Sequence, residues 1–324
     1  MSTSAVDHSP LFLVICVLAI LSISASICSA QSGVQGDNDT LSLCFLSDTQ
    51  DPIFLERIYQ TYDRNALARK LIFEKVCETN AKSVFHLGDL VSIGSGTDSW
   101  EDIDQFVKKL HEQGIEFSPI PGNHEYMLFS DRGITNFAYR YPNTKLTGYS
   151  RQFANVAVVL FNSNFKRLSE DEEKEQLSWY RRTLTDYENN PSIDFVIIGC
   201  HHSPFTNSTI VSGSEEVREF YLPEYYKSKK CKLFLGGHAH AYEHFRNNEK
   251  DFLVIGGGGG LLHPLRVGEG AEYHDIFGSS LEKRMFHFLL VKTYHDTLKV
   301  ELKMLRPDFE GFESIPQLIF VGDR

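Results

Sequence analysis

The sequence has few basic residues for its size, and this shortage narrows the partners that it can have. Lysine and arginine number 32 among 324 residues, against 43 aspartates and glutamates, so the formal net charge is -11 at pH 7. A protein that coats nucleic acid needs clustered cations to neutralise the phosphate backbone. We therefore expect no nucleic-acid-coating role. An acidic surface does not exclude a small anionic substrate, because bound metal ions reverse the field inside a pocket.

The sequence also lacks an apolar run long enough to cross a bilayer. Leu11 to Ala25 is almost entirely apolar but covers only fifteen residues, whereas a spanning helix needs about 20. Cys28 and Ala30 place small residues at the positions that a signal peptidase requires before Gln31. We predict a signal peptide over 1–30, and hence export to the periplasm or the cell exterior with no stable membrane span. No lysine or arginine precedes the apolar run, so an uncleaved anchor is the alternative.

Cysteine is scarce once the predicted signal peptide is set aside. Four remain: Cys44, Cys77, Cys200 and Cys231. An exported location permits disulfides. Three of the four lie in or beside strand-like apolar runs, where a free cysteine is often a small core residue, so the sequence leaves their pairing open.

After a polar linker at 31–40, strand-like and helix-like stretches alternate without an internal repeat. Apolar residues at helical spacing predict helices over Arg64–Cys77 and Trp100–Leu110, and Phe286–Val291 with Leu298–Leu305 predicts a β-hairpin. The aromatic-rich section Tyr126–Ser150 is expected to be an irregular insertion. Short apolar runs predict strands at Leu41–Leu46, Ser83–Leu87, Ile115–Ile120, Val156–Phe161, Phe195–Gly199, Cys231–Leu235 and Phe252–Ile255. We predict one α/β domain over 41–320, with its sheets covered by helices.

Side chains that can bind metal ions follow five of the predicted strands. Ligand sites of α/β folds form where the carboxyl ends of strands converge. Aspartate and asparagine at a strand end usually only form turns, but five such positions in succession favour a site. Imidazole and oxygen ligands without thiolate favour manganese, iron, zinc or cobalt. The residues are Asp48 with Gln50, Asp89, Asn123 with His124, His202, and His238 with His240.

Taken in order, these motifs resemble those of the calcineurin-like metallophosphoesterases. The matching segments are Asp48-Thr49-Gln50, Gly88-Asp89, Gly122-Asn123-His124-Glu125, His202-Ser203-Pro204 and Gly237-His238-Ala239-His240. The resemblance covers Leu41 to Leu262. It implies a four-layer α/β/β/α sandwich of two mixed sheets, and hydrolysis of a small phosphoester substrate at a dinuclear metal centre.

The resemblance also implies a role for each matching residue. One metal ion would be held by Asp48, Gln50, Asp89 and His240. The other would be held by Asp89, Asn123, His202 and His238. Asp89 would bridge the two ions, and His124 would protonate the leaving group or steady the phosphoryl oxygens.

The sequence departs from the family at two positions. Gln50 stands where the first motif, Asp-x-His, usually has histidine, and a neutral amide oxygen is a weaker ligand. The last motif is close to that of purple acid phosphatases, but their iron-binding tyrosine aligns with Ser92. We therefore expect no tyrosinate-to-iron colour.

Other polar residues near the motifs are weaker candidates for function. His201 precedes the proposed ligand His202, and the match of His202 to the motif His-x-Pro places His201 near the substrate pocket or the surface. His244 is a second candidate for contact with substrate. The run Gly256–Gly260 lacks the lysine of a phosphate-binding loop and is expected to be a close-packed or mobile loop.

These observations together predict an exported metal-dependent phosphoesterase, most simply a phosphomonoesterase. Two alternatives stay open. One is an enzyme of the same kind that acts on phosphodiesters or nucleotides, and the other is an extracellular metal-binding protein without turnover.

Overall fold

The computed structural model describes residues 40–53, 56, 58 and 64–322. The predicted signal peptide at 1–30 and all of the predicted linker except residue 40 lie outside these residues. A compact unit begins at Thr40. Within the described ranges, no helix has the length and apolar character that crossing a membrane requires. The four cysteines of this unit are free thiols.

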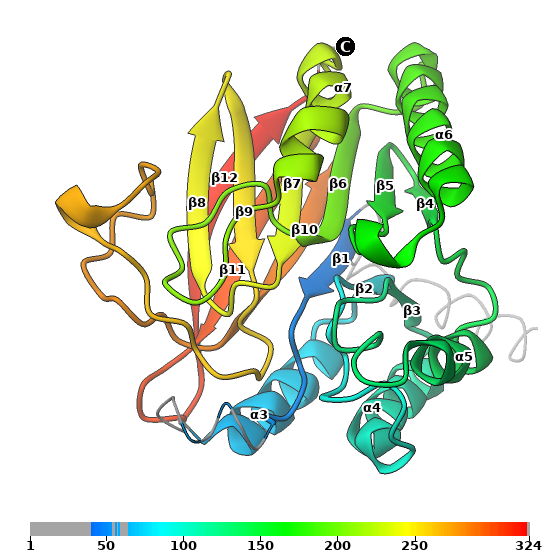
Figure 1. Ribbon diagram of the computed structural model, residues 1–324. Helices are drawn as coiled ribbons and strands as arrows, with labels where there is room; N and C mark the ends of the chain where they lie inside the picture. The colour runs from blue at the N-terminus through cyan, green and yellow to red at the C-terminus, as the bar shows by residue number, and fades with distance from the viewer. Residues whose placement is uncertain (1–39, 54–55, 57, 59–63, 323–324) are drawn as a thin grey trace, which may run out of the picture. The chain divides into compact units, whose positions relative to one another are not determined.

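One mixed sheet combines strands from the two ends of the compact unit (Figure 1). Its parallel part is β1, β2 and β3, and its antiparallel part is β10, β11 and β12, with β1 pairing antiparallel to β10. The order across the sheet is β12 (Phe312–Val321), β11 (Thr297–Leu305), β10 (His287–Tyr294), β1 (Leu41–Leu46), β2 (Ser83–His86) and β3 (Glu116–Pro119).

The second mixed sheet is formed by the middle of the chain. Its four inner strands are parallel, and each edge is closed by an antiparallel strand. The order is β4 (Gly148–Phe153), β5 (Val156–Phe161), β6 (Phe195–His202), β7 (Cys231–Gly237), β9 (Lys250–Ile255) and β8 (Tyr242–Asn247).

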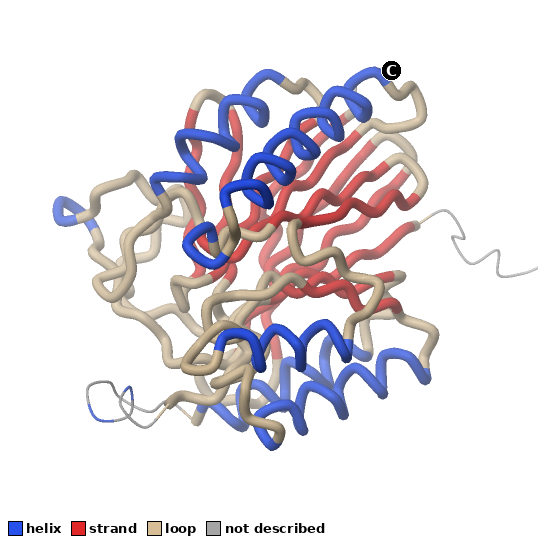
Figure 2. The backbone as a smooth tube through the Cα atoms, turned by 45° about the vertical axis from the view of Figure 1, so that its right-hand side comes forward, coloured by secondary structure: helices blue, strands red, loops and turns tan. Residues whose placement is uncertain are grey.

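Helices cover the outer face of each sheet, as Figure 2 shows. The helices on the first sheet are α3 (Asn65–Cys77), α4 (Glu101–Glu112) and α5 (Ser130–Arg140). Those on the second are α6 (Glu170–Asn189) and α7 (Leu222–Lys227), which follows a π-helical turn at Val217–Tyr221. Helix α6 begins with a capping box, in which Ser169 and Glu172 each accept the other's backbone N–H.

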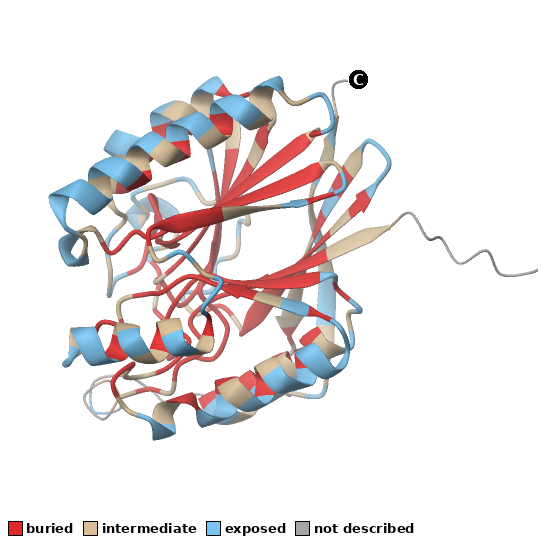
Figure 3. Ribbon diagram, turned by 90° about the vertical axis from the view of Figure 1, so that its right-hand side faces the viewer, coloured by how far each residue is buried: buried red, intermediate tan, exposed pale blue. Residues whose placement is uncertain are grey.

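Alternation along the strands builds the layers. Leu43 and Phe45 of β1 face the second sheet, whereas Cys44 and Leu46 face the helices, as the period of two in a strand requires. The central strands of both sheets are therefore buried on both faces, whereas the edge strand β12 is largely exposed, and Figure 3 shows buried strands between helices whose outer surfaces are exposed. The predicted four-layer α/β/β/α sandwich is confirmed.

Several parts of the chain differ from the expectation, and neither α7 nor β8 was predicted. The section Tyr126–Ser150 is not irregular, because it contains α5 and the start of β4. Its aromatic residues Phe137 and Tyr141 pack with Trp100 in the core. The C-terminal strand β12 was not predicted; it carries Pro316, which an edge strand tolerates and a central strand does not.

Candidate metal centre

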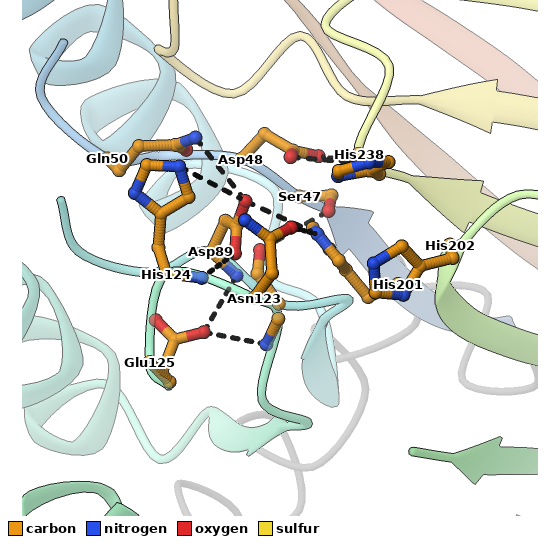
Figure 4. Close-up of polar contacts among 12 residues, drawn as sticks. Ser47, Asp48, Gln50, Asp89, Asn123, His124, Glu125, His201, His202 and His238 are labelled. Atoms are coloured by element: carbon orange, nitrogen blue, oxygen red, sulfur yellow. Dashed lines mark hydrogen bonds and ion pairs between the residues drawn. The ribbon is translucent and has the colours of Figure 1, made fainter. Parts of the chain in front are cut away.

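The predicted motifs converge where the two sheets deliver their carboxyl ends. Asp48 follows β1, Asp89 follows β2, and His238 follows β7. All three have positive φ, at 60°, 54° and 67°. Aspartate occupies this left-handed region at modest cost. The left-handed conformation turns the chain out of each strand and brings the two carboxylates to one side. Figure 4 shows the resulting cluster.

The carboxylate of Asp89 lies at the centre of the cluster and is almost completely buried. Its Oδ1 accepts the backbone N–H of His124 at 2.8 Å, and its Oδ2 lies 3.3 Å from Nε2 of His201. The amide Nε2 of Gln50 is 3.5 Å from the same Oδ2 (Figure 4). Burial opposes ionisation, but His201 and His124 outweigh it and lower the pKa of Asp89 well below its usual range.

Asp48 supplies the second buried carboxylate. Both of its oxygens accept the backbone N–H of His238, at 3.1 and 3.0 Å, and its Oδ1 lies 3.4 Å from Nε2 of His240. The two acidic groups therefore share a water-poor region in which each faces an imidazole.

Backbone carbonyls fix which nitrogen of three histidines carries the proton. Nδ1 of His201 donates to the carbonyl of Leu87 at 2.9 Å, and Nδ1 of His240 donates to that of Leu261 at 2.7 Å. Nδ1 of His124 donates to the carbonyl of Ser92 at 2.7 Å. A carbonyl oxygen only accepts hydrogen bonds, so Nδ1 of each ring must carry the proton. In the neutral ring each Nε2 therefore bears a lone pair, and all three lone pairs face the two carboxylates.

This donor set fits metal ions. Unprotonated imidazole nitrogens beside carboxylate oxygens repel one another unless a cation lies between them, and a backbone partner on the other ring nitrogen is the usual support of a ligating histidine. In the absence of a metal, burial opposes charge on His201, but Asp89 outweighs burial and raises the pKa of His201 to about 9. Two overlapping groups can hold metal: Asp48, Asp89 and His201, and His201, His202 and His238.

Gln50 supplies a further sign of fit. Its Nε2 faces Nε2 of His240 at 3.1 Å, while its Oε1 is buried without a hydrogen-bond partner among the described residues. Leaving a buried carbonyl oxygen unpaired is costly. A half-turn of the amide would bring Oε1 beside Asp89 and His240, where it is placed to ligate a cation.

Some of the remaining predicted residues lie in the cluster, and others do not. His124 is buried, with Nε2 3.9 Å from Oδ2 of Asp89. Asn123 directs Oδ1 to Nε2 of His201 at 3.0 Å. His201 is fully buried and in contact with the carboxylates, not at the surface. His244 pairs with Asp251 at 2.9 Å and shows no contact with the cluster among the described residues.

His202 faces a cavity of about 420 Å³ that adjoins the cluster. Its Nδ1 lies 2.9 Å from Oγ of Ser163. Burial and the neighbouring His201 lower the pKa of His202 to about 3. The cavity is lined by Asn123, Ser163, Asn164, Phe165, Lys166, Arg167, His202 and Ser212 to Glu216.

The run Gly256–Gly260 is close-packed against the cluster. A Cβ at Gly256 would lie 2.1 Å from the carbonyl oxygen of Ala239, and one at Gly260 would lie 2.6 Å from the ring of His240. The backbone N–H of Gly260 donates to the carbonyl of Asp48 at 2.9 Å. The glycines therefore let this loop press against both metal-binding motifs.

No role was predicted for Glu125, although it belongs to the motif Gly122-Asn123-His124-Glu125. Its buried carboxylate accepts four backbone N–H groups, from Asp89, Leu90, Val91 and Gly122, at 2.6 to 3.3 Å. It ties the loop after β2 to the loop after β3, and so holds Asp89 in place. The position of Glu125 directly after Asn123-His124 in this motif was the signal in the sequence that could have predicted this role.

Comparison with known proteins now identifies the family. The family model "Calcineurin-like phosphoesterase" matches residues 41–242. The chain belongs to the calcineurin-like phosphoesterase family. It is therefore a metallophosphoesterase with a buried histidine and aspartate site. No curated protein sequence matches the chain.

Solved structures share the metallophosphoesterase fold at low sequence identity. Purple acid phosphatase PPD1 from yellow lupin seeds has a TM-score of 0.59 and 17% identity over 86% of this chain, and the match covers 53% of the lupin protein, about half its length. GAP50, the anchor in the inner membrane complex of Plasmodium, has a TM-score of 0.60 and 13% identity over 86% of this chain and 89% of its own. A dimetal phosphatase from Danio rerio has a TM-score of 0.53 and 14% identity over 87% of this chain and 99% of its own.

Replacing Glu125 with Gln should lower the free energy of unfolding by about 3 kcal/mol, because an amide NH₂ would face backbone donors that now share a charged acceptor. Urea denaturation followed by circular dichroism measures the change. The control Glu112→Gln, exposed at the end of α4, should stay within about 0.5 kcal/mol of the native protein. Equal stability of both variants would show that the Glu125 carboxylate does not hold the two loops.

Proposed function

We propose that this protein is an exported phosphomonoesterase whose reaction depends on two metal ions. The observation that carries the proposal is the arrangement of two buried carboxylates and three imidazoles with bare Nε2 atoms. Asp89 would hold both ions, since its Oδ2 faces Gln50 on one side and His201 on the other. The ions are manganese, iron, zinc or cobalt, given ligands of nitrogen and oxygen alone.

The chain's own residues position the reaction. When bound, two metal ions activate water and neutralise the charge that develops on the phosphoryl group. His124 lies beside Asp89 with Nδ1 held by the carbonyl of Ser92, so its Nε2 is directed to the cluster. In the doubly protonated ring, the proton on that nitrogen is available to the leaving oxygen or to a phosphoryl oxygen.

The cavity beside His202 supports a monoester as the substrate. Lys166 and Arg167 line it, and neither forms an ion pair within the described ranges. Two glutamates also line it: Glu215 lies 3.8 Å from Arg218, and Glu216 accepts the hydroxyl of Ser214. A dianionic monoester gains more from two free cations than a monoanionic diester does.

An ester panel tests the proposed function. Protein loaded with manganese, iron, zinc or cobalt should hydrolyse p-nitrophenyl phosphate faster than bis(p-nitrophenyl) phosphate. Asp89→Ala should lose both metals and at least about 1,000-fold in kcat/KM, because the bridging charge is gone. The control Asp131→Ala, exposed on α5, should match the native protein. Faster diester hydrolysis would favour a phosphodiesterase, and bound metal without turnover would favour a binding protein.

The proposal of export rests on the apolar run and the small residues before Gln31. Expression of the full chain in a secreting host should yield a mature protein in the medium or periplasm whose first residue is Gln31. Intact-mass analysis with N-terminal sequencing reads this directly. An intact N-terminus on membrane-bound protein would establish the anchor in place of export.

A further inference from the structure

We propose that His201, not His202, is the metal ligand of the fourth motif, and that His202 is a side chain that contacts the substrate phosphate in the adjoining cavity. The proposal rests on the proposed function, since it assigns residues within the same metal centre. It also departs from the motif match, which placed His202 in the ligand position.

A bulge in the sheet explains how both neighbouring histidines come to face the site. Along β6 and β7, Cys200 pairs with Gly236 and His202 pairs with Gly237, so His201 has no partner of its own. Side chains of a regular strand alternate between its faces, but an extra residue breaks this alternation and re-aims its neighbours. The ring centroids of His201, His202 and His238 consequently lie 4.5 to 5.1 Å from one another.

His201 has the surroundings of a ligand. It is fully buried, and its Nδ1–H is committed to the carbonyl of Leu87. In the neutral ring its Nε2 therefore bears a lone pair, and this nitrogen lies 3.0 Å from Oδ1 of Asn123 and 3.3 Å from Oδ2 of Asp89. These are the two oxygens expected to hold the second metal, and a cation among them relieves three mutually repelling lone pairs.

His202 has the surroundings of a substrate contact. It is partly exposed and lines the cavity, whereas His201 does not. Oγ of Ser163 accepts the backbone N–H of His202 at 2.8 Å and lies 2.9 Å from its Nδ1. When the hydroxyl of Ser163 donates its proton to Nδ1, the ring carries its own proton on Nε2, as a hydrogen-bond donor for an anionic oxygen.

Two single variants separate the roles. The full chain, loaded with manganese and desalted, is assayed for metal per chain by mass spectrometry of the elements, and for inorganic phosphate binding by calorimetry. His201→Ala should fall from about two metals to about one. His202→Ala should keep about two metals but bind phosphate at least about tenfold more weakly, since a hydrogen bond to a charged group is worth about 1.5 to 3 kcal/mol.

Controls keep each outcome decisive. The exposed His111→Ala should match the native protein in both readouts. Ser163→Ala, which removes the hydroxyl beside His202 but leaves His201 untouched, should weaken phosphate binding and keep both metals, and it serves as the test should His201→Ala not fold by circular dichroism. Loss of a metal from His202→Ala or Ser163→Ala would overturn the proposal. Native protein that binds no metal would instead refute the proposed function itself.

Discussion

Two aspartates buried side by side, Asp48 and Asp89, impose the constraint on which the rest of the site depends. Neither carboxylate is exposed to water, so each needs compensating positive charge or donors. Backbone N–H groups of His238 and His124 supply part of this. The surrounding imidazoles, when neutral, add lone pairs in place of positive charge, and the amide Nε2 of Gln50 donates to one of these, Nε2 of His240, at 3.1 Å. Cations meet both needs at once, and this is why the cluster fits metals better than it fits a purely structural role.

The surrounding chain is organised to hold that array. Positive φ at Asp48 and Asp89 turns the carboxylates out of their strands, and Glu125 ties the two loops that carry Asp89 and Asn123. The glycine run lies so close behind His240 that side chains would not fit. A left-handed backbone at a residue other than glycine costs of order 1–3 kcal/mol. The buried layers of both sheets hold the loops in place against this cost. The two packed sheets thus hold the loops rigidly, and the loops carry the residues of the site.

Much of this was predictable from the sequence because it is local. The strand Leu41–Leu46 and the hairpin of β10 and β11 follow from alternation, and the strand-end motifs from their spacing. Other features depend on tertiary pairing. The bulge at His201 arises from the register of β6 against β7, and α5 is stabilised by packing on Trp100.

We propose that Asp89 joins two cations within this cluster. Anomalous diffraction from crystals of the manganese-loaded protein, collected with an absorption-edge pair of data sets, would locate them. We expect two peaks about 3.5–4 Å apart on either side of the Asp89 carboxylate, one beside Gln50 and His240 and the other beside Asn123 and His201. A single peak, or two peaks that do not share Asp89, would contradict it.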